Sequence, residues 1–214
     1  GVSGQLETQE IGFGETLHSL SRRYNIPEEK LARLNRVSSA SEMYAGINLI
    51  VVTPEEGTQA LAQRTSLSAG ETPLELAVRS GTSTWQISAW NRLDSPYQAV
   101  PGEVLHLPGD DSGPGALPPS VTAITMTLPL VQGKTGVLAV EAGQIITMTG
   151  MIDGYALNFM PGEDGRYYAL QGIHAMTPTG LKTVTVSGTL VDGSRFGFSQ
   201  LAPVVSGKYS YDPD

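Results

Sequence analysis

The side chains that most often carry chemistry are few in this sequence of 214 residues. It has no cysteine, which excludes cysteine nucleophiles and thiolate zinc sites. Among its three histidines, no two lie close in sequence, and we expect His106 and His174 to be structural. Glu163 and Asp164 form a carboxylate pair of the kind used in acid–base catalysis, but glycines flank the pair and indicate a solvent-exposed turn. We therefore predict no catalytic and no metal-binding residue in this chain.

Composition narrows the classes of function further. The formal net charge is −8, which argues against binding along a nucleic-acid backbone. No run of about twenty apolar residues is present, so we expect no membrane span. Hydrophobic residues make up 40% of the chain, which is enough for globular cores. The first five residues show no signal-peptide pattern and are typical of a mature or cloned start.

The elements that position any binding residues are indicated by an internal repeat with an offset of 56 residues. Gly14-Glu15-Thr16 recurs as Gly70-Glu71-Thr72, and Asn35-Arg36 recurs as Asn91-Arg92, without a gap. The same offset pairs further identical residues: Leu20 with Leu76, Arg23 with Arg79, Ser39 with Ser95, Gly46 with Gly102, and Leu49 with Leu105. An ungapped repeat of this length predicts two copies of one supersecondary unit.

Each copy has the pattern of a strand, two helices and a second strand. Thr16 and Thr72 are good N-caps for the first helices, because their hydroxyls can accept from an otherwise unpaired amide of the first turn. In the first copy we expect the second helix to begin at Pro27, where the missing N–H costs nothing. The closing strands are expected at residues 48–52 and 104–107.

Residues 14–49 and 70–105 resemble the LysM module. The first segment carries Gly-Glu-Thr-Leu, Arg-Tyr-Asn-Ile, Leu-Asn-Arg and Ala-Gly-Ile-Asn-Leu, and the second carries Gly-Glu-Thr-Pro-Leu, Trp-Asn-Arg-Leu and Val-Pro-Gly-Glu-Val-Leu. The resemblance implies a βααβ fold that binds N-acetylglucosamine-containing glycans, chiefly peptidoglycan or chitin. It also implies a shallow groove between the first strand–helix loop and the second helix–strand loop.

By position, the resemblance assigns glycan-binding residues to both grooves. They are Gly14, Glu15, Thr16, Leu17, Met43, Tyr44, Ala45 and Gly46 in the first module, and Gly70, Glu71, Thr72, Pro73, Ala99, Val100, Pro101 and Gly102 in the second. Exposed turn amides can bind acetamido groups, and small apolar side chains can pack their methyls. Pro73 replaces the family's usual leucine, and Ala45 a common proline. Turn and capping chemistry alone predicts the same residues, so a purely structural role for these loops stays open.

The sequence after the repeats changes in character. Residues 109–120 are rich in glycine, proline and aspartate and predict a connector between domains. Short β-rich segments then follow at residues 125–130, 137–140, 145–149, 156–160, 167–173, 183–190 and 196–201. About seven strands without a helical period predict a β-sandwich. The predicted fold class is α+β multidomain, with two βααβ modules and a C-terminal all-β sandwich.

The C-terminal half also resembles a known domain. Its pattern of Tyr-Tyr-Ala-Leu-Gln-Gly-Ile at residues 167–173, with Phe-Gly-Phe at 196–198, is similar to the Ig-like β-domain found just upstream of lysostaphin-type zinc endopeptidase domains. The resemblance implies a bacterial cell-wall hydrolase whose catalytic domain would follow Asp214. That domain's zinc needs a His-x-His pair, which this sequence lacks. We therefore expect no cofactor here, and zinc only in a downstream domain.

Together these observations predict the non-catalytic cell-wall targeting region of an exported bacterial peptidoglycan hydrolase. Its partners would be peptidoglycan or chitin-like polymers and a downstream catalytic domain, and its location extracellular or in the cell envelope. The alternative is a structural spacer or autoinhibitory region that packs against that catalytic domain. The predicted boundaries are 6–53 for the first module, 54–63 for a linker, 64–109 for the second module, 110–120 for a second linker and 121–211 for the β-domain.

Overall fold

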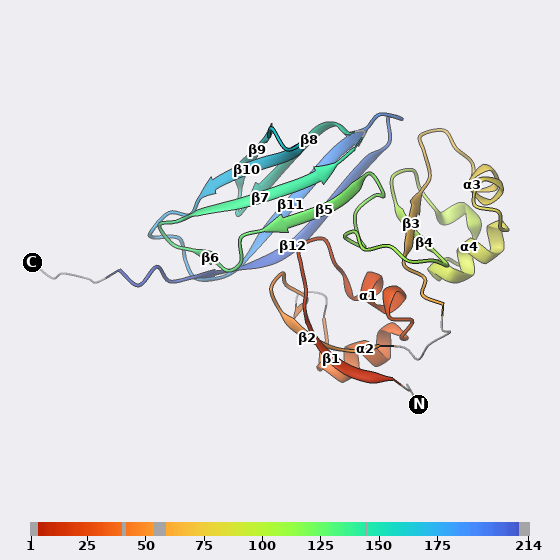
Figure 1. Cartoon of the computed structure of the whole chain (residues 1–214), viewed down its shortest axis with the longest axis horizontal. Helices are drawn as coiled ribbons and strands as arrows, with labels where there is room; N and C mark the ends of the chain where they lie inside the picture. Colours follow the sequence, from red (N-terminus) through yellow and green to blue (C-terminus); the bar gives the residue numbers. More distant parts are fainter. Residues whose placement is uncertain (1–3, 40–41, 54–58, 144, 210–214) are drawn as a thin grey trace, which may run out of the picture.

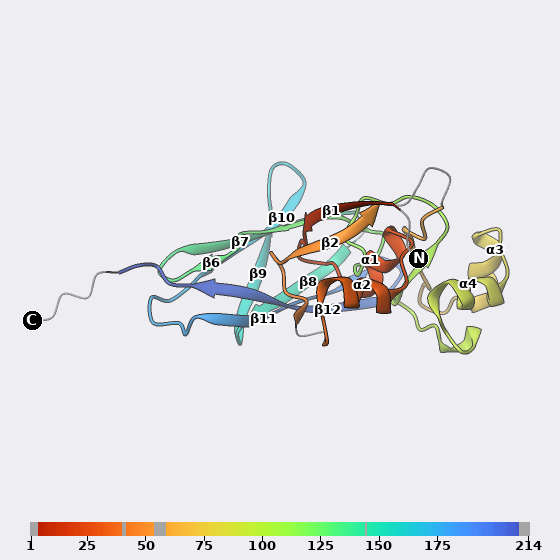
Figure 2. The ribbon, with the colours of Figure 1, turned by 90° about the horizontal axis from the view of Figure 1, so that it is seen from below.

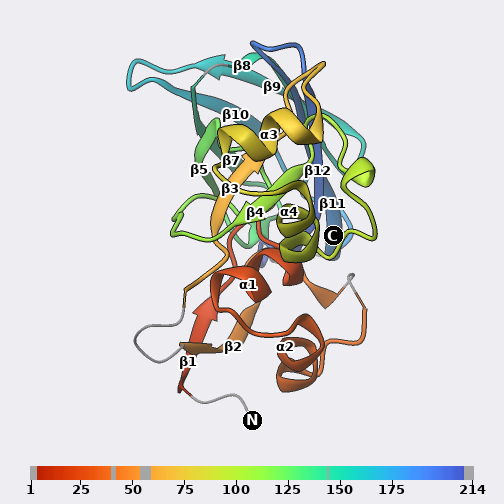
Figure 3. The ribbon, with the colours of Figure 1, turned by 90° about the vertical axis from the view of Figure 1, so that its right-hand side faces the viewer.

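The computed structural model describes residues 4–39, 42–53, 59–143 and 145–209, so half of the predicted linker at 54–63 lies outside the described residues. The chain forms two small α/β modules and one large β-domain (Figure 1). Both modules lie at the same end of the β-domain, and Figure 3 shows the second module in front of the sheet with the first module below it. The modules therefore pack on the β-domain and are not independent domains joined only by linkers.

The first module has the predicted order of elements. Strand β1 (Gln5–Glu10) pairs antiparallel with β2 (Asn48–Thr53), and helices α1 (Leu17–Arg23) and α2 (Glu28–Asn35) lie between them in sequence. Thr16 caps α1, as predicted: its hydroxyl accepts from the Ser19 amide, and the Ser19 side chain accepts from the Thr16 amide. The module has its own core, formed by Ile11, Leu20, Ile26, Leu31, Met43, Leu49, Val51 and Val52.

The second module repeats this plan. It comprises β3 (Gln63–Ser66), α3 (Pro73–Arg79), α4 (Thr84–Asn91), a 3₁₀ turn η2 (Pro96–Gln98) and β4 (Val104–Leu107). Thr72 caps α3 and Ser83 caps α4, both through reciprocal capping boxes. Leu67, Leu76, Ala77, Ile87, Leu105 and Leu107 form a separate core.

The repeated asparagine joins the second helix of each module to its closing strand. The Asn91 amide nitrogen donates to the carbonyl oxygens of Ile87 and His106, and its oxygen accepts from the His106 amide at 2.6 Å. Asn35 makes the corresponding bonds to Leu31 and Ile50. One side chain thus satisfies helix and strand groups at once, which explains why the asparagine recurs.

The β-domain is a single, strongly curled sheet of eight strands. The strands are β5 (Val121–Met126), β6 (Leu130–Val131), β7 (Thr135–Ala142), β8 (Ile145–Ile152), β9 (Tyr155–Pro161), β10 (Arg166–Gly172), β11 (Gly180–Leu190) and β12 (Arg195–Val205). Their order is β5-β7-β10-β9-β8-β11-β12-β6, with only the β6–β12 pair parallel. Figure 2 shows β7 and β10 on one side of the domain and β11 and β12 on the other.

This sheet differs from the predicted sandwich in two ways. Hydrogen-bonded pairing of β8 with β9 joins what would otherwise be two sheets into one continuous curled sheet. The strand predicted at 125–130 is also wrong as a unit, because β5 ends at Met126 and β6 begins at Leu130 on the opposite edge. Pro129 lies in this break, and its missing N–H cannot donate to a ladder. The curl encloses a core to which every strand from β5 to β12 contributes.

The segment predicted as a connector at residues 110–120 is packed against both neighbours. Arg64 of β3, whose side chain is only 3% exposed, forms an ion pair with Asp111 at 2.6 Å. Its Nη1 also donates to the carbonyl oxygens of Pro114, Leu117, Pro118 and Val121. A guanidinium buried in this way fixes the path of the segment between the second module and the β-domain.

Candidate functional site

In each module the two loops of the predicted groove lie side by side. The Gly46 amide donates to the Ile11 carbonyl at 2.8 Å, and the Gly102 amide donates to the Leu67 carbonyl at 3.0 Å. Both glycines have a positive φ, +89° for Gly46 and +84° for Gly102, which side-chain-bearing residues rarely adopt. The repeated glycine is therefore needed for the turn that brings the second loop against the first.

An ion pair fixes the first loop of each module to its helix. Glu15 pairs with Arg23 at 2.7 Å, and Glu71 pairs with Arg79 at 3.0 Å. Hydrogen bonds from Arg79 hold the pKa of the Glu71 carboxyl below its usual value. The recurrence of glutamate and arginine at the same offset thus has a local structural cause.

The groove of the first module is partly covered by strand β12. The Gly14 amide donates to Gln200 Oε1 at 3.0 Å, and Gln200 Nε2 donates to the Glu15 carbonyl at 3.1 Å. On the second loop, the Ala45 amide donates to the Leu201 carbonyl at 2.8 Å, and Ala45 is fully buried. Two backbone amides that the sequence assigns to glycan binding are therefore already bonded to the β-domain.

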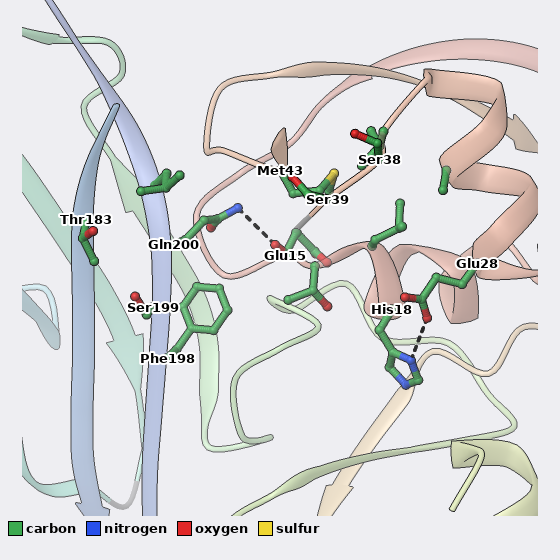
Figure 4. Close-up of a pocket in the computed structure, with 15 residues that line it drawn as sticks. Glu15, His18, Glu28, Ser38, Ser39, Met43, Thr183, Phe198, Ser199 and Gln200 are labelled. Atoms are coloured by element: carbon green, nitrogen blue, oxygen red, sulfur yellow. Dashed lines mark hydrogen bonds and ion pairs between the residues drawn. The ribbon is translucent and has the colours of Figure 1, made fainter. Parts of the chain in front are cut away.

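A cavity of about 490 Å³ remains beside this contact. One wall comes from the first module, including Thr16, Leu17 and Met43 of the predicted site, and the other comes from β11 and β12. Figure 4 shows Thr183, Phe198, Ser199 and Gln200 facing Glu15, Met43 and His18 across it. Four of the eight predicted residues of this groove thus line the cavity: Glu15, Thr16, Leu17 and Met43.

The corresponding loops of the second module are open to solvent. Gly70 and Thr72 are exposed in the first loop, and Pro101 and Val100 are exposed in the second, with Val100 at 55%. Glu71, Pro73 and Ala99 are half-buried. Only Gly102 is buried, because the backbone of Arg195 at the start of β12 lies against it. The two loops of the first module are therefore partly covered by β12, whereas those of the second module are mostly exposed to solvent.

Two histidines, His18 of α1 and His106 of β4, lie close together between the two modules. The rings of His18 and His106 lie 5.7 Å apart, and His18 Nδ1 is 3.2 Å from Glu28 Oε2. Burial, with smaller contributions from His18 and Arg22, lowers the pKa of His106 to about 4. Burial also lowers the pKa of His18. The His106 ring is therefore neutral near pH 7, and its structural role stays a prediction.

The residues considered for catalysis lie apart from these grooves. Glu163 and Asp164 are exposed in the turn between β9 and β10, where Asp164 accepts from the Tyr168 hydroxyl at 2.6 Å. His174 is exposed, and its Nδ1 accepts from the Met176 amide. Across the described residues, no group of three or more histidines and carboxylates is arranged to hold a metal. No helix in the described part of the chain is long and apolar enough to cross a membrane.

Sequence reasoning missed the β-domain's part in the first groove. Thr183, Phe198, Ser199 and Gln200 lie in ordinary alternating strands, and nothing in their spacing points to a contact with Gly14, which is 186 positions from Gln200. Of the tryptophans, Trp90 packs on the core of the second module and Trp85 is exposed.

Comparison with known proteins agrees with the two modules. No curated protein matches the chain. The family described as LysM domain matches residues 10–51 and 68–108, which are the two βααβ modules, and the β-domain lies outside both matches.

Proposed function

We propose that this chain binds N-acetylglucosamine-containing glycan, as found in peptidoglycan and chitin, through the open loops of the second module. The exposure of Gly70, Thr72, Val100 and Pro101 is the observation that carries this proposal. LysM domains are glycan-binding modules without catalytic activity, and the match at residues 68–108 supports the ligand class.

The chemistry of these loops suits an acetamido sugar. Within the described residues, the Gly70 amide donates no hydrogen bond, so it can donate to a ligand carbonyl. Exposed Val100 and Pro101 offer apolar surface to an acetyl methyl. The Glu71–Arg79 pair and the Thr72 capping box hold the first loop in place, which lowers the entropic cost of binding.

A pull-down on insoluble peptidoglycan, with chitin in parallel, tests the proposal. Val100→Asp places a charge on the binding surface without touching the caps, and we expect at least a tenfold loss of affinity, equivalent to about 1.4 kcal/mol. Val78→Asp is the matched control, because Val78 is exposed near the far end of α3. Equal retention of both variants and the unmodified chain would refute binding at these loops.

We further propose that the chain is the targeting region of an exported, cell-envelope peptidoglycan hydrolase, with zinc held in a catalytic domain after Asp214. The resemblance of residues 167–173 and 196–198 to the Ig-like domain found upstream of lysostaphin-type zinc endopeptidase domains supports this. Peptidoglycan cleavage by the full-length protein, lost on chelation and restored by zinc, is the expected result. A full-length protein that cleaves nothing would refute it.

A structural or autoinhibitory role is the second candidate, and one observation favours it for the first module. The hydrogen bonds from Gly14 and Ala45 to β12 use part of that groove for an internal contact. Under this proposal the first module packs against the β-domain and does not itself bind glycan. Deleting the second module would then abolish polymer retention while the remaining two units stay folded.

A further inference from the structure

Arg22 of α1 is a buried arginine without a counter-ion among the described residues. Only 8% of Arg22 is exposed, and its Nε and Nη2 atoms are buried and make no hydrogen bond in the described part of the chain. The nearby arginines differ in this respect, because Arg23 pairs with Glu15 at 2.7 Å and Arg64 pairs with Asp111 at 2.6 Å. A buried guanidinium is unfavourable unless a partner satisfies its charge and its donors, so the surroundings of Arg22 call for a ligand.

A third unpartnered nitrogen atom lies at the same junction, on the second module. His106 Nδ1 is buried and has no hydrogen-bond partner within the described residues. The His106 ring is 5.7 Å from that of His18, which precedes Arg22 by one turn on the same face of α1. Burial and then the charge of Arg22 lower the pKa of His18, and Arg22 also contributes to the lowered pKa of His106. The guanidinium therefore acts on both rings.

The other charges near Arg22 leave this junction positive. Arg92 adds a second positive charge, which acts on both Arg22 and His18. Glu28 is the carboxylate that opposes them, but its Oε2 is already 3.2 Å from His18 Nδ1 (Figure 4). Two guanidinium groups face one carboxylate here, and this balance favours an anionic ligand over a cation.

A cavity of about 250 Å³ adjoins the two histidine rings. His18 and His106 line it together with Glu103, whose Oε2 already accepts from a backbone amide of its own loop. The remaining walls come from the segment at 110–120 and from β12, so all parts of the fold meet around it. The His18 side chain is 38% exposed, which gives the junction access to solvent. Since one water occupies only about 30 Å³, a small ion fits in this space.

We propose that the junction between the two modules binds a small oxyanion, such as a phosphate group or a carboxylate, through Arg22 and His106. The Nε–Nη2 edge of a guanidinium is a fork that donates two parallel hydrogen bonds to two oxygens of one oxyanion. His106 Nδ1 donates a third bond in the tautomer that carries the proton on this nitrogen. The bound anion supplies a counter-ion to Arg22 and joins the first module to the second. The inference does not depend on glycan binding.

Thermal melts at constant ionic strength, with sodium phosphate replacing sodium chloride, test the proposal. We expect phosphate to raise the melting temperature of the unmodified chain in a saturable way, since a ligand of the folded state stabilises it. Arg22→Met should show no saturable shift, and it should melt no lower than the unmodified chain in chloride, because it removes an unpaired buried charge. Arg33→Met is the matched control: Arg33 is exposed on α2, and its variant should keep the full shift.

Calorimetry with inorganic phosphate measures the binding itself, and acetate tests the carboxylate. Arg22→Lys keeps the charge but loses the fork, so we expect binding at least tenfold weaker than in the unmodified chain. This variant also serves if Arg22→Met does not fold. An equal phosphate shift in the unmodified chain, Arg22→Met and Arg33→Met would overturn the proposal. Absence of saturable heat for both anions would do the same, and would leave water as the partner of Arg22.

A pull-down identifies the source of the anion. Peptidoglycan carries carboxylates on its peptides, whereas chitin carries none. If the polymer supplies the anion, Arg22→Lys should lower retention on peptidoglycan and leave retention on chitin unchanged. If a free ion occupies the site, retention on both polymers should be unchanged while phosphate binding is weakened. Failure of the proposed function is distinguishable from both, because the unmodified chain would then bind phosphate but neither polymer.

Discussion

Replacing Arg64 with methionine tests whether one buried side chain holds the second module to the β-domain. Methionine keeps the apolar stem of Arg64 but removes its charged head. The substitution deletes the ion pair to Asp111 and the donors to the carbonyls of Pro114, Leu117, Pro118 and Val121. Gly113, whose added Cβ would lie 1.9 Å from Arg64 Nη2, packs directly on the head that is lost.

The size of the effect follows from what is left unpaired. Removing one partner of a buried ion pair costs about 3–5 kcal/mol. The Asp111 side chain is 22% exposed, so water can recover part of its solvation. The carbonyls share a single nitrogen, so their separate contributions of about 1–3 kcal/mol each do not add. We expect Arg64→Met to lower the free energy of unfolding by about 3–4 kcal/mol.

Urea unfolding followed by tryptophan fluorescence measures this loss, because both tryptophans lie in α4 of the second module. Arg79→Met is the matched control. Its ion pair with Glu71 involves an arginine side chain that is 52% exposed, and such pairs contribute about 0–1 kcal/mol. Equal losses for the two variants, or a loss below about 1 kcal/mol for Arg64→Met, would refute the assignment of Arg64 as the fixed point of the segment.

Three further predictions concern stability. Folding lowers the pKa of His106 from 6.5 to about 4, so the free energy of unfolding should fall by about 3 kcal/mol as the pH drops from above 6.5 towards 4. Urea titrations at each pH measure this slope, and a flat profile would contradict the prediction. Asn91→Ala should lower the free energy of unfolding by about 2–3 kcal/mol and Asn35→Ala by less, since Asn91 is buried and Asn35 only half-buried. Thermal melts compare the two variants, and the reverse order would contradict this reasoning. Gly102→Ala should separate the second module from the β-domain, because the new Cβ would lie 1.9 Å from the Arg195 carbonyl oxygen. The control Gly70→Ala has a similar φ but open space around it and should cost only about 1 kcal/mol, so equal melting points of the two variants would contradict the contact.

The parts of the fold that depend on local chemistry could be predicted from the sequence. The capping hydroxyls of Thr16 and Thr72 act within three residues, and the helices begin directly after them. The repeat adds strength to each prediction, because Asn35 and Asn91 face the same requirement in two places. Local propensity and tertiary structure agree here.

The packing between units could not be predicted, because its contacts join segments far apart in sequence. Nothing local to Gln200 indicates that it bonds to Gly14 and Glu15. The glycine- and proline-rich composition of residues 109–120 predicts a connector, and only the distant Arg64 explains why this segment is buried. For the same reason the sequence assigns equal sites to both modules, whereas burial by β12 makes them unequal.

The bond from the Ala45 amide to the Leu201 carbonyl has a chemical consequence of its own. The acceptor is the oxygen of a secondary amide, which is the same functional group that an N-acetyl sugar presents. A peptide unit of β12 therefore acts as a built-in competitor, satisfying the loop with the chemistry that a ligand would bring. Detaching β12 would therefore return the Ala45 amide to solvent and leave it without its internal acceptor.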